Sequence, residues 1–365
     1  MSRTAVAILS TENLLHNISV IKSKVGETKI IAMVKANAYG HGIRSVASRI
    51  DKHVDILGVA SIDEALALRK IGVKAPIMLA EGVFEAGELL IAAAENFEVV
   101  FHNPMQIEWL EKSSLPLPLH SWIKVNTGMG RLGFSIEECA QYYDKLNSLE
   151  QVVKPIKVMS HFACSDELEH PLNNQQILAF KGIIAELKGE FSICNSAAIF
   201  HFPECHYDYV RPGLAIYGVS PINNVSAESL GLKPVMTVQS NLISVKMMPK
   251  GSYIGYGARY CCAEDMLVGV IAFGYGDGYP ITAKDGTPIL VNKKKCALIG
   301  RVSMDMMMVD LRECQDAKVG DAVILWGHGL PIEEVAHYTN NITYDMLCGI
   351  QHRVKFIWTQ GERNG

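Results

Sequence analysis

The feature that most constrains the fold is an alternation of short apolar runs with helical patterns over roughly the first 220 residues. Eight runs have the length and composition of buried β-strands, and they cover residues 29–34, 56–60, 76–80, 98–101, 121–125, 156–161, 191–195 and 210–217. Helix signals lie between them, including the capping boxes Ser61-Ile-Asp-Glu64 and Ser135-Ile-Glu-Glu138. Eight strands that alternate with helices predict an α/β fold, a (β/α)8 barrel of the TIM type.

The pattern changes after about residue 230, where helical periodicity gives way to short strands. These cover residues 234–245, 266–273, 287–291, 297–310 and 322–325, with a helix near 332–339 and a last strand near 354–358. Their turns are rich in Gly, Asp, Asn and Lys, and we interpret Lys293-Lys294-Lys295 as one such turn. The sequence therefore predicts a barrel domain over residues 1–230 and a mainly β domain over residues 231–365.

Composition excludes several classes of function. The net charge is −4, from 34 basic and 38 acidic residues, which argues against nucleic acid as a partner. No apolar stretch is long enough to span a bilayer, and the N-terminus lacks the apolar core of a signal peptide. The nine cysteines are odd in number and without CxxC spacing, so we expect no metal site and a reducing, cytoplasmic location.

Lys35 is the first candidate for chemistry, because it ends the first predicted strand in the segment AMVKANAYGHG. Burial disfavours an ammonium group, and a neutral amine is what Schiff-base chemistry requires. The small and polar residues that follow leave room for a ligand. For a lysine alone, however, a side chain that snorkels from a strand end is the more common explanation.

Other polar residues also follow barrel strands, at the end where such barrels place their active sites. They are Tyr39 after the first strand, Arg131 after the fifth, His161 after the sixth, Asn195 and Ser196 after the seventh, and Arg211 in the eighth. Singly, each has an ordinary explanation, such as a core histidine or an ion pair of Arg211 with Asp208 or Glu204. Their coincidence at one end of the barrel favours a single site.

The loops after the last two barrel strands bind phosphate in many TIM barrels. Here they supply Ser196 and the backbone of Gly213 and Leu214. A lysine on one side and a phosphate cradle on the other predict pyridoxal 5′-phosphate (PLP), held by Lys35 as a Schiff base.

Seven segments together resemble the alanine racemase family of fold-type III PLP enzymes: AMVKANAYGHG, KVNTGMGRLGF, SHFACSDE, NSAA, RPGLAIYG, IGYGARY and GRVSMDM. The resemblance runs in matching order from about residue 9 to residue 353. It implies a head-to-tail homodimer in which the C-terminal β domain of one subunit completes the active site of the other. It also implies interconversion of L- and D-alanine, which supplies D-alanine for peptidoglycan synthesis.

The resemblance also implies residue roles. Lys35 matches the lysine that holds PLP and acts as one acid/base, and Tyr256 matches the opposing base from the other subunit. His161 is expected to hydrogen-bond Tyr256, and Arg211 to bond both His161 and the pyridine nitrogen of PLP. Two bases on opposite faces would allow one to remove the α-proton while the other returns it.

The remaining matched positions surround these groups. Tyr39, Ser196, Gly213 and Leu214 match phosphate-binding positions. Arg131 and the backbone of Met304 match those that hold the substrate carboxylate, and Lys124 matches a lysine that many members carbamylate to orient Arg131. Asn195 and Asp305 match supporting positions, and Tyr275 and Asp277 match the entrance corridor. Two departures concern the corridor and one phosphate contact: Ile281 stands where many members have arginine, and no proline follows Arg353-Val354.

Three alternatives remain open. A racemase of broader range, acting on serine or lysine, has the same features. A PLP-dependent decarboxylase shares the two-domain plan but should show a Gly-rich phosphate loop and a C-terminal cysteine motif, which are not found here. A PLP-binding protein without catalytic activity would resemble the barrel alone, so the β domain and Tyr256 count against it.

Overall fold

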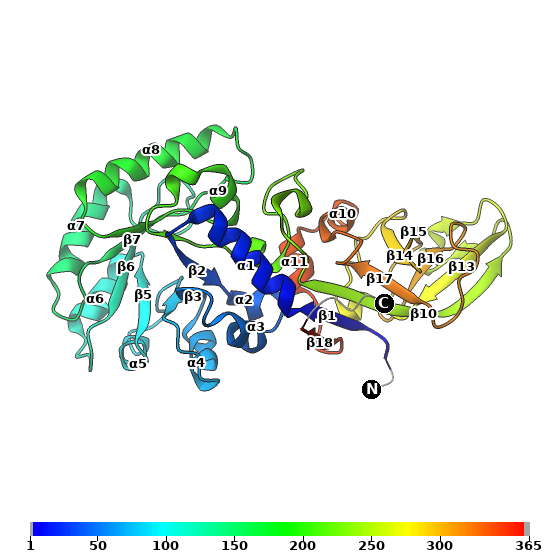
Figure 1. The fold of residues 1–365 in the computed structure, drawn as a ribbon, viewed down its shortest axis with the longest axis horizontal. Helices are drawn as coiled ribbons and strands as arrows, with labels where there is room; N and C mark the ends of the chain where they lie inside the picture. The colour runs from blue at the N-terminus through cyan, green and yellow to red at the C-terminus, as the bar shows by residue number, and fades with distance from the viewer. Residues whose placement is uncertain (1–2, 361–365) are drawn as a thin grey trace. The chain divides into compact units, whose positions relative to one another are not determined.

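The computed structural model describes residues 3–360 and divides into two compact units. One unit comprises Asn17–Ile216 and Pro221–Val225, and the other comprises Met1–His16, Tyr217–Ser220 and Ser226–Gly365. Figure 1 labels most of the helices and longer strands of both. Within residues 3–360, no helix is both long and apolar enough to cross a membrane.

The first unit is a closed barrel of eight parallel strands, as predicted. Its strands are β2 (Lys29–Met33), β3 (Ile56–Val59), β4 (Ile77–Leu79), β5 (Phe97–Phe101), β6 (His120–Lys124), β7 (Lys157–Met159), β8 (Glu190–Ser192) and β9 (Tyr209–Val210). Each pairs in parallel with the next, and β9 pairs with β2 to close the barrel. Side chains from seven of these strands, including Trp122 and Met159, form one buried cluster, so the barrel is packed rather than hollow.

Helices follow most of the barrel strands. They are α3 (Ile43–Ile50), α4 (Ile62–Lys70), α5 (Glu88–Ala94), α6 (Pro104–Lys112), α7 (Ile136–Ser148), α8 (Pro171–Glu186) and α9 (Ser196–His201). The segment α2 (Lys35–Tyr39) after β2 is not a right-handed helix but a left-handed turn. Helix α1 (Thr11–Val25) precedes β2, and the short 3₁₀ turns η1 (Pro203–Cys205) and η2 (Leu214–Tyr217) lie near the end. Helices α6, α7 and α8 lie on the outside of the barrel strands (Figure 1).

One predicted capping box forms and the other does not. Ser135 Oγ accepts the N–H of Glu138 at 3.2 Å, and Glu138 in return accepts the N–H of Ser135. The Ser61 side chain makes no cap at α4. Glu64 instead accepts the N–H groups of Ala60 and Ala36, so its carboxylate supports the segment after β2 rather than its own helix.

The second unit is built on one eight-stranded sheet with the order β13-β16-β15-β14-β17-β10-β1-β18. Its strands are β1 (Val6–Ser10), β10 (Met236–Met248), β13 (Met266–Ile271), β14 (Pro288–Val291), β15 (Lys294–Ile299), β16 (Met307–Asp310), β17 (Ala322–Trp326) and β18 (Lys355–Thr359). A separate hairpin pairs β11 (Tyr253–Ile254) with β12 (Tyr260–Cys261). The unit also contains α10 (Ile332–His337), α11 (Thr343–Cys348), η3 (Glu228–Leu230), η4 (Tyr256–Ala258) and η5 (Tyr275–Asp277). A mainly β C-terminal domain is thus confirmed.

The N-terminal residues belong to the second unit, which differs from a simple division at residue 230. Strand β1 lies between β10 and β18, pairing antiparallel with the first and parallel with the second. The sequence of so short a strand does not indicate which strands it pairs with, because the partners lie more than 200 residues away.

Three predicted segments differ in detail. The eighth barrel strand was predicted over residues 210–217, but only Tyr209–Val210 is extended and Leu214–Tyr217 is a 3₁₀ turn. Residues 297–310 were predicted as one strand but form β15 and β16, separated by the loop that carries Met304. The turn predicted at residues 293–295 lies at Asn292-Lys293, whose φ angles of 48° and 66° suit a tight hairpin.

Candidate active site

A left-handed turn follows β2. Residues Ala36–Tyr39 all have φ between 51° and 55°, and Gly40 continues the turn at 77°. For residues with a Cβ atom this conformation costs about 1–2 kcal/mol each, so the surroundings must hold it in place. Glu64 accepts the first N–H of the turn at 2.8 Å, and Asn37 Oδ1 accepts the N–H of Ile43 at 2.9 Å. Backbone strain of this kind gathers at ligand sites, and it marks this end of the barrel.

Lys35 begins the turn at the carboxyl end of β2. Its Nζ lies 3.4 Å from Oε1 of Glu81, a residue that follows β4. The Lys35 side chain is partly exposed rather than sealed in the core, so a ligand can reach its amine. The carboxylate of Glu81 partners the amine, so Lys35 does not simply extend into solvent.

Ser196, Gly213 and Tyr39 form a cradle of hydroxyl and N–H groups at the same barrel end. Ser196 Oγ accepts the N–H of Gly213 at 2.7 Å and that of Ala215 at 3.4 Å. A Cβ atom on residue 213 would lie 2.2 Å from the hydroxyl oxygen of Tyr39, so only glycine leaves room for this phenol. Hydroxyl groups beside main-chain N–H groups are suited to an anion.

Asn195 precedes Ser196 of the cradle and caps α9, the helix that Ser196 begins. Its Oδ1 caps α9 by accepting the N–H of Ala198 at 3.1 Å, and it also accepts the hydroxyl of Ser165 at 2.7 Å. Leu214 begins η2 directly after Gly213. The Asn195 side chain is therefore engaged in holding the backbone of α9 rather than aimed at a ligand.

Arg211 is 4% exposed and is surrounded by neutral acceptors. Its guanidinium donates to the hydroxyl of Ser192, to the carbonyl of Ser160 and, at 3.2 Å, to the carbonyl of Ile193. Burial lowers the pKa of Arg211 to about 10, which still leaves the side chain protonated at neutral pH. The site thus contains a fixed buried cation without a carboxylate partner among these contacts.

The same guanidinium lies 3.2 Å from Nδ1 of His161. Burial first, and then the positive charges of Arg211 and Lys124, hold the pKa of His161 well below its usual value near 6.5. The imidazole is therefore neutral at pH 7. Since Nδ1 faces a donor, the ring proton is on Nε2, which can donate to a further acceptor.

Lys124 ends β6 and is nearly buried, and it lines one small cavity with Arg131 and His161. Burial lowers the pKa of Lys124 to about 8, and the positive charges of Arg211, Arg131 and Lys35 act in the same direction. Part of the Lys124 population is consequently a neutral amine near physiological pH. The excess of positive charge at this end of the barrel favours an anionic ligand.

Tyr256 belongs to the second unit, where η4 joins β11 to β12. Its side chain is 70% exposed, so the hairpin presents the phenol to its surroundings. Gly255 precedes it with φ 71°, and a Cβ atom there would lie 2.6 Å from Cε of Met308. The hairpin thus packs against Met308 at the residue before Tyr256.

Two loops of the second unit carry the other predicted residues. Tyr275 and Asp277 lie in η5, and Met304 and Asp305 lie in the loop between β15 and β16. The N–H of Tyr275 donates to the carbonyl of Ser303 at 3.0 Å, and the N–H of residue 276 donates to the carbonyl of Met304 at 2.8 Å. The four residues are thus brought together, in a unit separate from Lys35.

Sequence reasoning missed Glu64 and Glu81, which contact the Lys35 segment directly. Glu81 lies two residues after β4, so the strand-end rule would have found it. It also missed Arg3 and Arg353, which both contact Asp277. No local signal marks Arg3, because its position depends on the unpredicted pairing of β1.

Comparisons with known proteins agree over nearly the whole chain. The family model described as "Alanine racemase, N-terminal domain" matches residues 9–221, and that described as "Alanine racemase, C-terminal domain" matches residues 235–358. An alanine racemase of Aeromonas hydrophila is 45% identical over 96% of this chain and 98% of its own length. One from Legionella pneumophila (strain Lens) is 44% identical over 98% of this chain and all of its own length.

Solved structures give the same result. The biosynthetic alanine racemase of Pseudomonas aeruginosa superposes with a TM-score of 0.95 at 38% identity, covering 98% of this chain and 99% of that one. The alanine racemase of Acinetobacter baumannii gives a TM-score of 0.93 at 37% identity, covering 98% and 100%.

Proposed function

This chain belongs to the alanine racemase family, and on that premise we propose that it interconverts L- and D-alanine with PLP bound at the carboxyl end of its barrel. The observation that carries the proposal is the placement of an accessible lysine, Lys35, and an anion cradle on strands of one barrel end. PLP needs both: an amine for its aldehyde and a site for its phosphate.

The residues present fit this cofactor. The phosphate would be held by the hydroxyls of Tyr39 and Ser196 and by the N–H groups of Gly213 and Leu214, the Gly213 N–H turning to it from Ser196, to which it otherwise donates. The aldehyde carbon would be held by Lys35. The Tyr39 hydroxyl can take its place in the cradle only because residue 213 lacks a side chain, since a Cβ atom there would lie 2.2 Å from it.

A Gly213→Ala protein is expected to bind PLP at least ~10-fold more weakly, because the new methyl group displaces Tyr39 and disturbs the N–H donated to Ser196. The measurement is a titration of the apoprotein with PLP, followed by absorbance. Gly182→Ala is the matched control, since a Cβ atom there meets no atom within 4 Å in the middle of α8. If both variants bound PLP as tightly as wild type, the cradle would not be the site that holds the phosphate.

Catalysis requires two groups that exchange a proton with the α-carbon of alanine. When bound, PLP withdraws electrons from that carbon and makes its hydrogen acidic. Lys35 Nζ takes or returns the proton on one face, and the Tyr256 hydroxyl does so on the other. A phenol is a weak acid, so a hydrogen-bond donor beside Tyr256 is needed to favour the anionic form that accepts a proton.

His161 and Arg211 supply that support. The neutral imidazole has its proton on Nε2, available to the phenol oxygen, while Nδ1 accepts from the buried guanidinium. Arg211 would also donate to the pyridine nitrogen of the cofactor. Because Arg211 holds its proton at neutral pH, it would leave that nitrogen unprotonated.

Arg131 and the backbone of Met304 hold the substrate carboxylate, and Lys124 orients Arg131. A positive Lys124 would repel Arg131, with which it shares a cavity. Addition of CO2 to its amine converts it to an anion that can pair with the guanidinium. The lowered pKa of Lys124 supports this modification, because only the neutral amine reacts with CO2.

Carbamylation of Lys124 is therefore expected to depend on pH. At constant total bicarbonate, the carbamate should increase as pH rises toward about 8, where Lys124 loses its proton, and then level off. The measurement is the carbamate resonance of protein equilibrated with ¹³C-bicarbonate, expected at one per chain. A Lys124→Gln protein should lack it. A Lys74→Gln protein, changed at an exposed lysine, should keep it.

Several further features belong to the proposal. The active enzyme is a head-to-tail homodimer, supported by the exposure of Tyr253, Tyr256, Met304 and Met306 on the second unit. The protein acts in the cytoplasm, supported by nine free cysteines, and its D-alanine serves peptidoglycan synthesis. Tyr275 lines the entrance to the site, where the exposed Ile281 replaces the arginine of many members. Asp277 is buried and acts at the entrance only by supporting the turn that carries Tyr275.

The experiment that tests the function is chiral analysis of wild-type holoenzyme incubated with L-alanine, and separately with L-serine and L-lysine. Formation of D-alanine at the highest kcat/KM supports the proposal. Faster racemisation of serine or lysine would replace it with a broader-range racemase. Release of CO2 without D-amino acid would instead indicate the decarboxylase.

A further inference from the structure

We propose that Arg3 is a positioning residue for substrate binding. Together with Arg353 it holds Asp277 and Asp305 in a four-residue ionic clamp, and the clamp fixes the loop that carries Met304. The inference rests on the proposed function, in which the backbone of Met304 holds the substrate carboxylate.

The sheet brings the two arginines to one place from opposite ends of the sequence. Strands β1 and β18 pair in parallel, with Val6 opposite Lys355. The segments that precede the two strands therefore lie at the same end of the pair. Arg3 lies three residues before Val6, and Arg353 lies two residues before Lys355. The N–H of Lys355 also donates to the carbonyl of Ala5 at 3.3 Å, which ties the two segments together.

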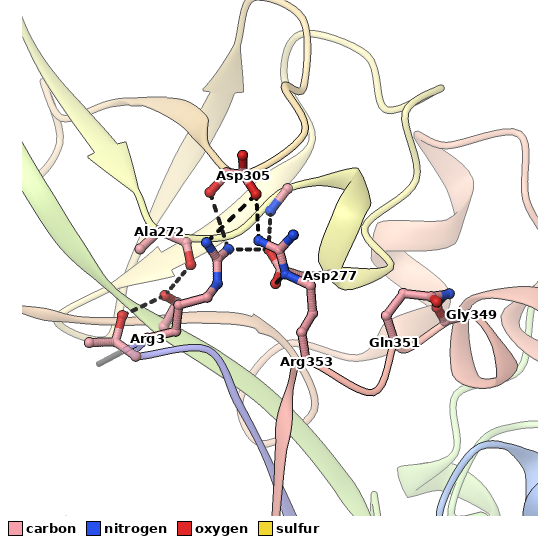
Figure 2. A network of polar contacts seen from close by, with 10 residues as sticks. Arg3, Ala272, Asp277, Asp305, Gly349, Gln351 and Arg353 are labelled. Atoms are coloured by element: carbon pink, nitrogen blue, oxygen red, sulfur yellow. Dashed lines mark hydrogen bonds and ion pairs between the residues drawn. The ribbon is translucent and has the colours of Figure 1, made fainter. Parts of the chain in front are cut away.

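The guanidinium groups of Arg3 and Arg353 converge on the two carboxylates (Figure 2). Arg3 lies 2.5 Å from Oδ2 of Asp277, and Arg353 Nε lies 2.8 Å from its Oδ1. Arg353 also contacts Asp305 Oδ1 at 2.5 Å, while Arg3 reaches the carbonyl of Asp305 at 3.4 Å and its carboxylate at 3.7 Å. The four charges balance, so the clamp serves to hold its parts in place rather than to attract an ion.

Asp277 is the inner member of the clamp, with a fully buried carboxylate. A buried charge is costly unless it is paired and hydrogen-bonded. In addition to its contacts with the two arginines, Asp277 accepts the N–H of Gly274 at 2.9 Å. The position of the Asp277 carboxylate therefore fixes the start of η5. Asp305 is half exposed and lies on the loop itself.

Motion of η5 cannot be separated from motion of the Met304 loop. The two are joined by backbone bonds from Tyr275 and Gly276 to Ser303 and Met304. Their contact is also too close for side chains, since a Cβ atom on Gly274 would lie 2.3 Å from the Ser303 carbonyl oxygen. A change at the Asp277 carboxylate is therefore passed to the backbone of Met304.

Arg3 is itself anchored, as its part in the clamp requires. The hydroxyl of the neighbouring Thr4 lies 3.1 Å from that of Ser240, and Ser240 donates to the carbonyl of Ala272 at 2.9 Å. Ser240 is buried on β10, beside β1. Arg3 is thus attached to the sheet through its neighbour Thr4, and its guanidinium in turn holds the loop in position.

The charge arrangement separates positioning from folding. If Arg3 is removed, Arg353 still contacts both carboxylates, so the buried charge of Asp277 is not left without a cation. The unit should therefore fold. What is lost is the direct link between β1 and the loop, including the contact of Arg3 with the Asp305 carbonyl.

The test compares wild-type and Arg3→Gln holoenzymes. We expect KM for L-alanine to rise about 5- to 20-fold with kcat within about twofold, because a displaced carboxylate site weakens binding more than proton transfer. Competitive inhibition by propionate, which has the carboxylate without the amine, should weaken by the same factor. Hydrogen exchange in the peptide spanning residues 301–306 should accelerate, and Arg3→Lys should recover part of the loss.

Arg312→Gln is the matched control, since Arg312 is about as exposed and pairs with Asp310 and Glu264 on the same unit. It should leave KM, the propionate constant and loop exchange unchanged. If Arg3→Gln lowers the melting temperature but changes none of these, Arg3 only stabilises the fold and the inference is overturned. If Arg3→Gln does not fold, Asp305→Asn should give the same rise in KM, and an unchanged KM would overturn it equally.

The two proposals fail in different ways. If wild type binds PLP but racemises no alanine, the proposed function is wrong, and exchange in the 301–306 loop still shows whether the clamp exists. If wild type racemises alanine and Arg3→Gln has the same KM, only the positioning role is wrong.

Discussion

A Lys35→Ala protein is expected to racemise alanine at least ~10³-fold more slowly than wild type. The substitution removes the amine that binds the cofactor aldehyde and, in the same step, the proton acceptor of one face. Lysine-bound PLP absorbs near ~420 nm, so this band should also disappear. Both changes are measured on protein reconstituted with excess PLP, by absorbance and by chiral analysis of the product.

The control for this prediction lies on the same strand. Lys29→Ala changes the lysine at the opposite end of β2, which pairs with Glu190 at 2.7 Å outside the site. It should retain the absorbance band and most of the activity. A Lys35→Ala protein that kept the band would place the cofactor on another amine, and the whole assignment of the barrel site would fall with it.

Tyr256→Phe is expected to reduce racemisation by ~10²–10⁴-fold, because the base on the second face is lost while the first remains. If the active sites are shared between subunits, this protein and Lys35→Ala should complement each other when mixed. Each mixed dimer would contain one site with both residues intact. At equal amounts and random exchange, about a quarter of wild-type activity should return.

The complementation experiment needs two controls. Subunit exchange must be shown independently, for example by native mass spectrometry of differently tagged subunits. Tyr253→Phe, at an exposed tyrosine of the same hairpin, should leave activity nearly unchanged. Exchange without recovery of activity would falsify the shared-site arrangement, and Tyr256 would then have to act within its own chain.

Much of the barrel could be predicted because its signals are local. A parallel strand buried on both faces is a short apolar run, and such runs are visible one at a time. The carboxyl-end rule then placed Lys35, Arg211 and Ser196 at one end of the barrel without knowledge of any contact. The predicted end of the eighth strand was wrong because the apolar residues 214–217 resemble a strand but turn over the cradle as η2.

Contacts that depend on distant partners could not be predicted. Ser61 and Glu64 have the spacing of a capping box, yet Glu64 supports the strained turn after β2, where an unsatisfied N–H competes for it. The left-handed conformation of Ala36–Tyr39 could likewise not be predicted from residue propensities, because alanine and tyrosine disfavour it. Tertiary contacts outweighed local preference at both places.

The sequence by itself determined most of the barrel strands, their parallel order and the residue types at their carboxyl ends, because apolar periodicity and strand polarity are properties of short segments. Only the tertiary structure decided that β1 belongs to the second unit, that Glu81 partners Lys35, and that Arg3 and Arg353 share Asp277. Each of these depends on a pairing across many residues of chain, whose free energy is set by the partner and not by the segment itself.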